Sequence, residues 1–457
     1  MKPPFFCSLL TAALLLQAPV GQAQKLPKKL DALATQYAKA GQFNGTVLVA
    51  DHGKVVFTKG YGLANREWNQ PNAADIKFRL GSLTKQFTAL LVMQLVEKGQ
   101  LKLDVPISTY LPDYARASGD KITLHHLLTH TSGIPNYTSK SQFQTFNTQH
   151  INPLTAVSIF ATLPLEFEPG STYHYSNSGY FLLGAIIEKL TGKPYAQVLS
   201  ENILLPLHMQ DSGYDLSETV LSRRAAGYEK TANGSLVNTS YIDMSGPYAA
   251  GSMYSTVVDL YKWDQALYTN QLLNDASKAL LFKPFRSDYA YGWTAVKRLA
   301  GSDSVSILRH AGVINGFRTF MLRVPKDQQL VVVLDNESNE YTPKISSELL
   351  QVLHHGHPVG PEPAARKPVA VDAATVAPYV GRYQLSPTFF ITVTAAGNQL
   401  SAQATGQSPF VLVATAPARF TVQGVPAEVE FVKNANGAVE KLILHQGGHD
   451  SPGAKVE

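Results

Sequence analysis

Cysteine is almost absent from this chain of 457 residues, which contains a single one, Cys7. Disulfide bonds within the chain are therefore excluded, and so are metal sites built from several thiolates. Cys7 also lies in the N-terminal segment that we expect to be removed, so the mature protein has no thiol chemistry. Its fold must depend on a hydrophobic core rather than on cross-links.

Long hydrophobic runs are missing too, and the N-terminal segment instead has the pattern of a secretory signal peptide. Lys2 precedes a short apolar stretch, Leu9 to Leu16, and the small residues of Gly21-Gln22-Ala23 follow. A membrane anchor is disfavoured, because a spanning helix needs ~20 apolar residues. We expect residues 1–23 to direct export to the periplasm or the medium, and no transmembrane segment in the mature chain.

The chain also has no long run of one charge. Lysine and arginine total 39 against 34 acidic residues, and no basic run is longer than Lys28-Lys29. Because nucleic-acid-binding surfaces need a basic patch, nucleic acid is not an expected partner. A hydrophobic content of 44% is that of a globular protein, and the length predicts one large domain plus a smaller one.

The order of strand-like and helix-like segments predicts an α+β fold for residues 24–356. A helix is expected near residues 30–40, a hairpin over 45–57, strands at 291–293, 304–308, 317–324 and 329–334, and a helix at 345–353. The intervening part, about 100 to 280, is mostly helix and loop by pattern. This order indicates an antiparallel β-sheet flanked by helices with a helical insertion, and an active site between the two.

A second domain is predicted at the C-terminus. Prolines interleaved with glycine and alanine indicate a linker over residues 357–374. Beyond it, residues 375–457 contain short alternating segments separated by turn signals, which predict a small all-β domain. The expected strands are 383–385, 389–393, 410–413, 427–432 and 442–445.

Ser82 and Lys85 stand three residues apart at the start of a segment with an apolar helical face that ends near Gly99. Residues i and i+3 share a helix face, and a side chain in the first turn lies among unpaired backbone N–H groups. Ser82 is therefore a candidate nucleophile, with Lys85 as its base. The spacing alone is weak evidence, because Ser118 and Lys121 repeat it in a polar stretch.

Tyr175 and Asn177 lie two residues apart in a turn that leads into an apolar helix. A tyrosine near a lysine ammonium is expected to have a lowered pKa, so Tyr175 could exchange a proton with Ser82 and the leaving group. The amide of Asn177 could orient Lys85 or bind a substrate carbonyl. The same spacing at Tyr268 and Asn270 closes a helix-like segment, and we interpret it as structural.

A third element is His310-Ala311-Gly312-Val313, which precedes an apolar strand. We expect Gly312 to let a substrate backbone lie against the strand edge, and the amides of Val313 and Ser82 to bind an oxyanion together. With His310, these residues complete the candidate substrate-binding set.

Together these elements resemble the serine β-lactamase and penicillin-recognising hydrolase family, in particular its branch of class C β-lactamases, D-alanyl-D-alanine carboxypeptidases, D-aminopeptidases and esterases. The family's signatures are Ser-x-x-Lys, Tyr-x-Asn and Lys-Thr-Gly or His-x-Gly, and they occur here in that order. The resemblance spans roughly residues 28 to 355 and includes Leu127 to Pro135, Phe167 to Gly170 and Ala250 to Thr256. It implies a β-lactamase/transpeptidase-like fold and, for the terminal domain, the barrel-like appendage of some members.

The departures from the family pattern bear on the substrate. His310-Ala311-Gly312 lacks the ammonium and the hydroxyl of Lys-Thr-Gly, which help to hold a substrate carboxylate. Efficient β-lactamase activity is therefore disfavoured, and peptidase or esterase action is favoured. Arg309 and Arg318 flank the motif and could meet a substrate carboxylate or serve in surface ion pairs.

His125, His126 and His130 raise the alternative of a metal site. No His-Glu-x-x-His pattern accompanies them, so we expect structural hydrogen bonds instead, with no metal and no cofactor.

The sequence thus predicts an exported serine hydrolase. Ser82, Lys85 and Tyr175 are its catalytic residues, and an acyl-enzyme forms on an ester, an amide or a D-amino-acid peptide. The alternative is a penicillin-binding or cell-wall-fragment-sensing protein with little turnover. The partner is a small-molecule or peptide substrate, and the oligomeric state stays open.

Overall fold

The computed structural model describes residues 25–456, except 142, 144–146, 232–233, 301–302, 355–359, 361–368, 388, 406–408, 423–426, 435 and 447–448. The predicted leader and most of the predicted linker therefore lie outside the described residues. The chain divides into two compact units, Met1–Pro361 and Glu362–Glu457, and each is described by itself.

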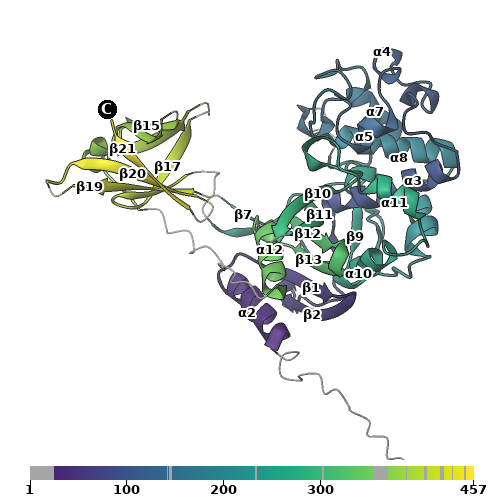
Figure 1. Cartoon of the computed structure of the whole chain (residues 1–457), viewed down its shortest axis with the longest axis horizontal. Helices are drawn as coiled ribbons and strands as arrows, with labels where there is room; N and C mark the ends of the chain where they lie inside the picture. The colour runs from purple at the N-terminus through teal and green to yellow at the C-terminus, as the bar shows by residue number, and fades with distance from the viewer. Residues whose placement is uncertain are drawn as a thin grey trace, which may run out of the picture. The chain divides into compact units, whose positions relative to one another are not determined.

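The first unit is built on a six-stranded antiparallel sheet with the strand order β10-β11-β12-β13-β1-β2 (Figure 1). Its strands are β1 (Gly45–Asp51), β2 (Lys54–Tyr61), β10 (Thr294–Ala300), β11 (Asp303–Ile314), β12 (Phe317–Val324) and β13 (Gln329–Asp335). Because β1 pairs with β13, with Val47 opposite Val333, the first and last strands of the unit are neighbours. The β1–β2 turn uses positive φ at His52 and Gly53, as a two-residue hairpin requires.

One face of the sheet is covered by α2 (Lys25–Lys39) and α12 (Thr342–Leu353), which also contact each other. Their apolar faces, with Leu33 and Leu349 among the buried residues, join side chains of the sheet such as Val331 in one core. Both helices are amphipathic, as surface helices that pack on a sheet need to be.

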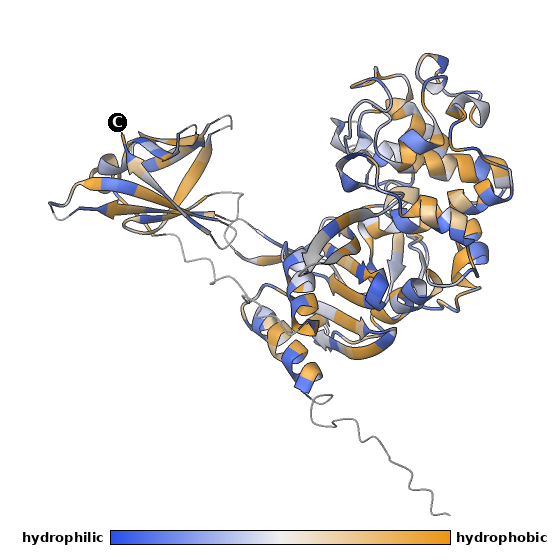
Figure 2. Ribbon diagram, in the orientation of Figure 1, coloured by the Kyte–Doolittle hydropathy of each residue, from blue (hydrophilic) through white to orange (hydrophobic). Residues whose placement is uncertain are grey.

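The other face carries the larger core and most of the helices. These are α3 (Thr84–Glu97), α4 (Arg116–Gly119), α5 (Leu124–Leu128), α7 (Pro153–Ala161), α8 (Asn177–Thr191), α9 (Tyr195–Leu199), α10 (Val257–Ala266) and α11 (Asp275–Leu281). Figure 2 shows hydrophobic residues along these helices and on the strands that they cover. α3 is buried on nearly every side. From Thr84 to Leu95 every residue except Gln94 is buried, including Lys85.

Short strands and single helical turns connect these layers. The strands are β3 (Leu63–Asn65), β4 (Gln70–Pro71), β5 (Phe78–Arg79), β6 (Gly213–Tyr214), β7 (Tyr228–Lys230), β8 (Leu236–Asn238) and β9 (Met253–Ser255). Two single turns matter for the site, η1 (Gly81–Leu83) and η5 (Tyr248–Ala250). β9 pairs with both β5 and β6, and this small sheet leads directly into η1.

The predicted α+β fold with an antiparallel sheet is confirmed, with local differences. Residues 291–293 form a bend rather than a strand, because Gly292 has φ of +76° and the strand begins only at Thr294. The segment after Ser82 is not a helix with one apolar face, since α3 is enclosed by α8, α9, α11 and η5.

The second unit is a closed eight-stranded antiparallel barrel, which confirms the predicted all-β domain. Its strands are β14 (Gly381–Ser386), β15 (Phe389–Ala396), β16 (Gln399–Ala404), β17 (Phe410–Ala416), β18 (Arg419–Val422), β19 (Ala427–Lys433), β20 (Val439–Gln446) and β21 (His449–Lys455). A short helix, α13 (Ala373–Val376), precedes them. Aromatic side chains fill the interior, with Tyr379 stacked on Phe431 at a centroid distance of 4.4 Å.

Three barrel strands have no counterpart among the predicted ones. β16 is rich in glutamine and alanine, β18 is only four residues long, and β21 contains Pro452 and Gly453. Such residues disfavour a strand locally. They are tolerated here because β14 and β20 pair with β21 and close the barrel.

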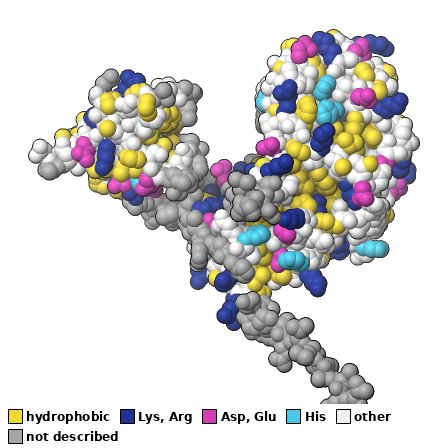
Figure 3. Space-filling view, viewed as in Figure 1, with side chains coloured by type: hydrophobic (Ala, Val, Ile, Leu, Met, Phe, Trp, Pro, Cys, Tyr) yellow, Lys and Arg dark blue, Asp and Glu magenta, His cyan; other side chains and the backbone are white. Residues whose placement is uncertain are grey.

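On the face drawn in Figure 3, basic and acidic side chains are interspersed around apolar areas. No helix in the described part of the chain combines the length and the hydropathy needed to cross a membrane.

A buried ion pair joins the sheet to α10. Arg323 Nε donates to Asp264 Oδ1 at 2.7 Å, and both side chains are almost inaccessible. Arg323→Met should lower the free energy of unfolding by about 3–5 kcal/mol, because it leaves a buried carboxylate without its partner. Denaturant unfolding followed by tryptophan fluorescence measures this effect.

The double variant Arg323→Met/Asp264→Leu is the control for the charge, since it removes both ions. The double variant should recover most of the free energy of unfolding that Arg323→Met loses. Equal destabilisation in the single and double variants would show that the pair acts only by filling space.

Candidate active site

Ser82 lies in η1, the single turn between β5 and α3, as the sequence pattern placed it. Two hydrogen bonds hold the backbone of Leu80, just before this turn: Leu80 N donates to Met253 O at 2.8 Å, and the Thr319 hydroxyl donates to Leu80 O at 2.7 Å. Gly81 adopts φ of +55°, which favours glycine. The Ser82 side chain is therefore held at the start of a buried helix.

The amine of Lys85 lies beside Ser82 on the same helix face. Its Nζ is 3.0 Å from Ser82 Oγ, 2.8 Å from Asn177 Oδ1 and 2.9 Å from the carbonyl oxygen of Ala250. The side chain is fully buried. The structure thus brings together Ser82, Lys85 and Asn177, which lie up to 95 residues apart in the chain.

Burial lowers the pKa of Lys85 well below its ordinary value. No carboxylate offsets this desolvation among the described groups that act on Lys85. A neutral amine has two hydrogens and one lone pair, and Asn177 Oδ1 and Ala250 O can only accept. In the neutral form that burial favours, the two hydrogens point to these oxygens and the lone pair faces the Ser82 hydroxyl.

Tyr175 completes this cluster, with its ring centroid 4.9 Å from Lys85 Nζ. The prediction of a lowered pKa for Tyr175 is wrong, since burial raises its pKa and a hydrogen bond with Ser82 only partly opposes the rise. The physical reason is that desolvation, the largest effect on Tyr175, disfavours the charged phenolate. Tyr175 is therefore a protonated phenol that hydrogen-bonds to Ser82.

Asn177 is the first residue of α8 and is held from both sides. Its backbone N–H donates to Asn136 Oδ1 at 3.1 Å, and its Nδ2 donates to Thr138 Oγ1 at 3.4 Å. Because Nδ2 is the donor there, Oδ1 faces Lys85. Orienting Lys85, one of the two roles expected of Asn177, fits this arrangement.

Gly312 has a different role from the one expected. A Cβ atom at Gly312 would lie 1.9 Å from Leu80 O and 2.2 Å from Thr319 Oγ1. The space beside this glycine is therefore filled by the segment that carries Ser82, not by a substrate. Gly312 lets β11 approach η1.

Val313 lies at the edge of β11 that faces Ser82. Pairing of β11 with β10 stops at Arg309, so the following residues have a free edge on that side. A Cβ at Gly81 would lie 2.7 Å from Val313 N, which places this nitrogen against η1. The arrangement is compatible with the predicted pair of amides from Ser82 and Val313.

His310 is buried behind the cavity rather than in it. Its Nε2 lies 2.9 Å from the Tyr289 hydroxyl, and its Nδ1 lies 2.7 Å from Ala311 O. Burial, and next the proximity of Lys85, lower the pKa of His310 to about 3. His310 is thus neutral and engaged at both nitrogens, which does not support direct contact with a substrate.

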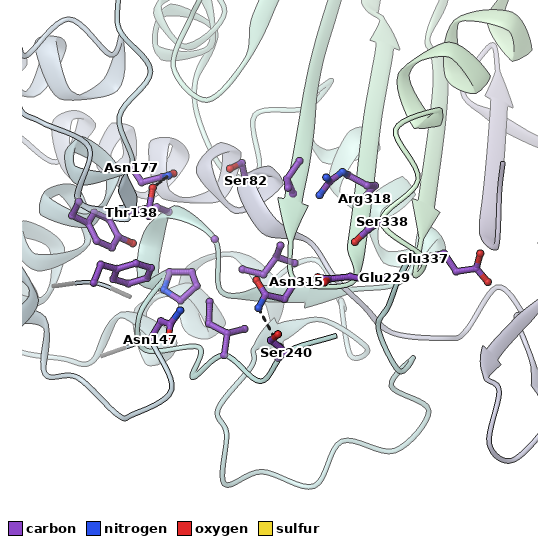
Figure 4. Close-up of a pocket in the computed structure, with 18 of the residues that line it drawn as sticks. Ser82, Thr138, Asn147, Asn177, Glu229, Ser240, Asn315, Arg318, Glu337 and Ser338 are labelled. Atoms are coloured by element: carbon purple, nitrogen blue, oxygen red, sulfur yellow. Dashed lines mark hydrogen bonds between the residues drawn. The ribbon is translucent and has the colours of Figure 1, made fainter. Parts of the chain in front are cut away.

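A cavity of about 710 Å³ opens beside Ser82 (Figure 4). Of the predicted site residues, Ser82, Asn177 and Val313 line it. Arg318 also lines the cavity, whereas Arg309 does not. Of the two arginines that could meet a substrate carboxylate, only Arg318 therefore lies where it can do so. The labelled polar side chains in Figure 4 surround the space, so the cavity suits a polar, peptide-sized substrate.

Two contributors to the site were missed by sequence reasoning. Ala250 acts through its backbone carbonyl, for which no side chain gives a signal. Tyr289 acts through His310, and it follows η6 (Arg286–Asp288) in a segment without a motif.

The predicted structural role of the histidines agrees with their contacts. His125 Nδ1 lies 2.8 Å from the Tyr291 hydroxyl, and His126 caps α5 through Thr123. Among the described residues no group of His, Cys, Asp and Glu has the arrangement of a metal site. Ser118, the second serine with a lysine three residues on, donates to Ala115 O on α4.

Two family models match this chain. The model described as Beta-lactamase matches residues 30–353, and a domain of unknown function, DUF3471, matches residues 365–455. The matched ranges correspond to the sheet-and-helix unit and to the barrel.

Similar proteins include penicillin-binding proteins and an amidase. Penicillin-binding protein 4* of Bacillus subtilis (strain 168) is 30% identical over 458 residues, which cover 95% of this chain and 100% of that protein. The crystal structure of D-amino acid amidase from Ochrobactrum anthropi SV3, complexed with L-phenylalanine amide, has a TM-score of 0.63 and 26% identity, and the match covers 73% of this chain and 99% of that one. The octameric penicillin-binding protein homologue from Pyrococcus abyssi, at 24% identity, shares the fold with a TM-score of 0.65 over 93% of this chain and 99% of that one.

The approach of β11 to η1 can be tested at Gly312. Gly312→Ala should slow the reaction of Ser82 with a fluorophosphonate by about 100-fold, because the new Cβ displaces Leu80 and with it the turn that holds Ser82. Intact-mass spectrometry follows the labelling rate.

Gly119→Ala is the matched control, since Gly119 lies on α4 and its Cβ would meet side-chain atoms of Tyr114 and Ser108 at 3.1 and 3.5 Å and the Ser108 backbone only at 3.8 Å. Labelling of Gly312→Ala at the wild-type rate would contradict the role of this glycine.

Proposed function

This chain belongs to the β-lactamase family of serine hydrolases, and we propose that it is an exported hydrolase that cleaves an ester, an amide or a D-amino-acid peptide through an acyl-enzyme on Ser82. The observation that carries the proposal is the buried amine of Lys85, whose Nζ lies 3.0 Å from Ser82 Oγ and whose pKa burial lowers, so that its neutral form can accept the hydroxyl proton. A serine hydroxyl needs such a base to attack a carbonyl near neutral pH.

The proposed reaction begins when Ser82 Oγ attacks the substrate carbonyl carbon and its proton passes to Lys85 Nζ. The backbone N–H groups of Ser82 and Val313 stabilise the oxyanion. Tyr175, which hydrogen-bonds to Ser82, passes a proton to the leaving group as the scissile bond breaks, and Lys85 restores the proton to Tyr175. A water molecule then attacks the acyl carbon and loses a proton to the same base. The bond between the acyl carbon and Ser82 Oγ breaks, Lys85 returns the proton to Oγ, and the acid is released.

Peptidase, amidase or esterase action is favoured over efficient β-lactam hydrolysis. No ammonium stands at the position of His310, whose ring is held by Tyr289 away from the cavity. Similarity to a D-amino acid amidase supports an amide of a D-amino acid as substrate. Arg318, on the cavity wall, is the candidate to bind an anionic group of the substrate.

The alternative, a penicillin-binding protein with little turnover, is supported by the similarity to penicillin-binding protein 4*. In that case the acyl-enzyme forms and is not hydrolysed. Measurements of labelling and of turnover together distinguish the two.

Export and the domain layout belong to this proposal. Residues 1–23 serve as the signal peptide, residues 24–356 as the hydrolase domain, residues 357–374 as the linker and residues 375–457 as the barrel domain. The leader pattern of Lys2 and the apolar stretch after it supports export.

Ser82→Ala should abolish both labelling and turnover. Wild-type protein should gain the mass of a fluorophosphonate adduct and hydrolyse a short-chain p-nitrophenyl ester, while Ser82→Ala should lose turnover by roughly 10⁴- to 10⁶-fold because the attacking atom is gone. D-phenylalanine amide, its L-isomer and a penicillin are tested alongside. Intact mass and product release are the measurements.

Ser118→Ala is the matched control and should behave as wild type. Labelling or turnover that survives in Ser82→Ala would refute the nucleophile assignment. Stoichiometric labelling without repeated turnover would favour the penicillin-binding alternative.

The pH dependence of labelling reports the protonation of Lys85. The base must be neutral, so the rate should rise with pH through the lowered pKa of Lys85 and level off well below the ordinary lysine value of ~10.4. Lys85→Arg keeps a positive charge at all these pH values and should be slower by about 10²- to 10⁴-fold. Labelling rates between pH 5 and 9 provide the test.

Lys77→Arg is the control, because Lys77 is a nearly buried lysine that pairs with Asp211 outside the cavity. A wild-type rate that rises only near the ordinary lysine pKa would exclude a neutral Lys85 as the base.

A further inference from the structure

His130 is a buried histidine whose place in the site is not accounted for by the mechanism above. Its side chain is 1% exposed, and its backbone adopts φ of +56°, a conformation that L-residues rarely adopt. It follows α5 and stands behind the catalytic cluster. A backbone held in this region usually serves a purpose that the surrounding structure enforces.

The two ring nitrogens of His130 differ in their partners. Nδ1 accepts the backbone N–H of Ser176 at 3.2 Å, so a neutral ring carries its hydrogen on Nε2. Nε2 has no hydrogen-bond partner within the described part of the chain. An unpaired buried N–H destabilises a fold, so stability alone does not explain a histidine here.

His130 contacts the Tyr175 loop at three points. Its carbonyl oxygen accepts the His174 N–H at 2.9 Å, its Nδ1 holds Ser176, and its ring lies 4.2 Å from the Tyr175 ring between centroids at an interplanar angle of 38°. These contacts fix the residues on both sides of Tyr175 and the ring itself. Asn177, the next residue, orients Lys85.

The surroundings of His130 keep it uncharged. Burial lowers its pKa well below the ordinary value, and the proximity of Lys85 and His310 adds to this. The titratable groups that face it come from every neighbouring element: Tyr173, His174 and Tyr175 from the loop, Tyr180 from α8, Tyr289 after η6, His310 from β11 and Lys85 from α3. None of them is a carboxylate, so a positive charge on His130 would have no counter-ion and would repel a charged Lys85.

We propose that His130 is a positioning residue of the acyl-transfer site: its ring holds Tyr175 on Ser82 and, by packing behind the Tyr175 and Tyr180 rings that lie over Lys85 Nζ, keeps water from that amine. The proposal rests on the proposed function, because positioning matters only if Ser82 reacts. His130 itself touches neither the nucleophile nor the cavity.

Two variants separate the two parts of this role. His130→Asn keeps an acceptor for Ser176 N–H and tolerates the positive φ, but it removes the ring that covers Tyr175. His130→Phe keeps the ring and loses the acceptor. Each should lower kcat for the p-nitrophenyl ester by about 10- to 100-fold and change KM by less than about threefold, since the reacting groups are misplaced while the cavity is intact.

The pH profile distinguishes positioning from a merely structural role. In His130→Asn, water gains access to Lys85, so the pKa of Lys85 rises towards its ordinary value. The acidic limb of the profile of kcat against pH should then move to higher pH by about half a unit or more. In His130→Phe the aromatic ring still keeps water from Lys85, so the acidic limb of the profile should remain at the wild-type pH.

His125→Asn is the matched control. His125 lies on α5, makes one hydrogen bond to a tyrosine hydroxyl, at Tyr291, and has no ring contact with Tyr175. It should retain wild-type kcat and the wild-type pH profile. Thermal unfolding of all variants shows whether each is folded at the assay temperature.

The proposal is supported if kcat falls in both His130 variants and the acidic limb moves only in His130→Asn. It is overturned if a folded His130→Asn keeps the wild-type kcat and profile, even if its melting temperature falls. If His130→Phe does not fold, His130→Asn alone decides the matter. A wild-type protein without Ser82-dependent turnover would instead remove the proposed function, which the Ser82→Ala comparison detects separately.

Discussion

The burial of the Lys85 amine without a counter-ion is the constraint on which the rest of the site depends. A lysine in this position cannot keep its proton as it would in water, because desolvation favours the neutral form. Its two hydrogens are taken up by Asn177 and the Ala250 carbonyl, which leaves the lone pair for Ser82. The neutral histidines His130 and His310 and the protonated Tyr175 fit the same uncharged surroundings.

Water can be kept from that amine only if α3 is enclosed, and the fold encloses it with α8, α9, α11 and η5 within the larger core. The close packing of β11 on η1 depends on two missing side chains, since a Cβ at Gly81 or at Gly312 would collide with the opposing backbone. The hydroxyl of Thr319 then ties Leu80 to the sheet. The nucleophile is thus positioned by the sheet as much as by its own helix.

Much of the architecture could be anticipated from local patterns. Strand-like residue patterns predicted strands at 317–324 and 329–334, which are β12 and β13, and a hairpin over 45–57, which is β1 and β2. The residue pattern predicted a set of short strands, and only the resemblance implied a barrel, because β21, with its proline and glycine, has no strand signal of its own and closes the barrel by pairing with β14 and β20. In the site, the spacing of Ser82 and Lys85 predicted that these two side chains would meet, since residues i and i+3 share a helix face. Only the resemblance to the family implied that Tyr175 and Asn177 would join them.

The sequence by itself determined the family, the order of the motifs and the candidate nucleophile, because these depend on residue types and short-range spacing. Only the tertiary structure decided the charge states and the roles of the supporting groups. The pKa of Tyr175 is raised rather than lowered, His310 turns to Tyr289, Gly312 faces Leu80, and a backbone carbonyl at Ala250 binds Lys85. The physical reason is that desolvation and close approach depend on what surrounds a group in space, and residues distant in the chain supply those surroundings.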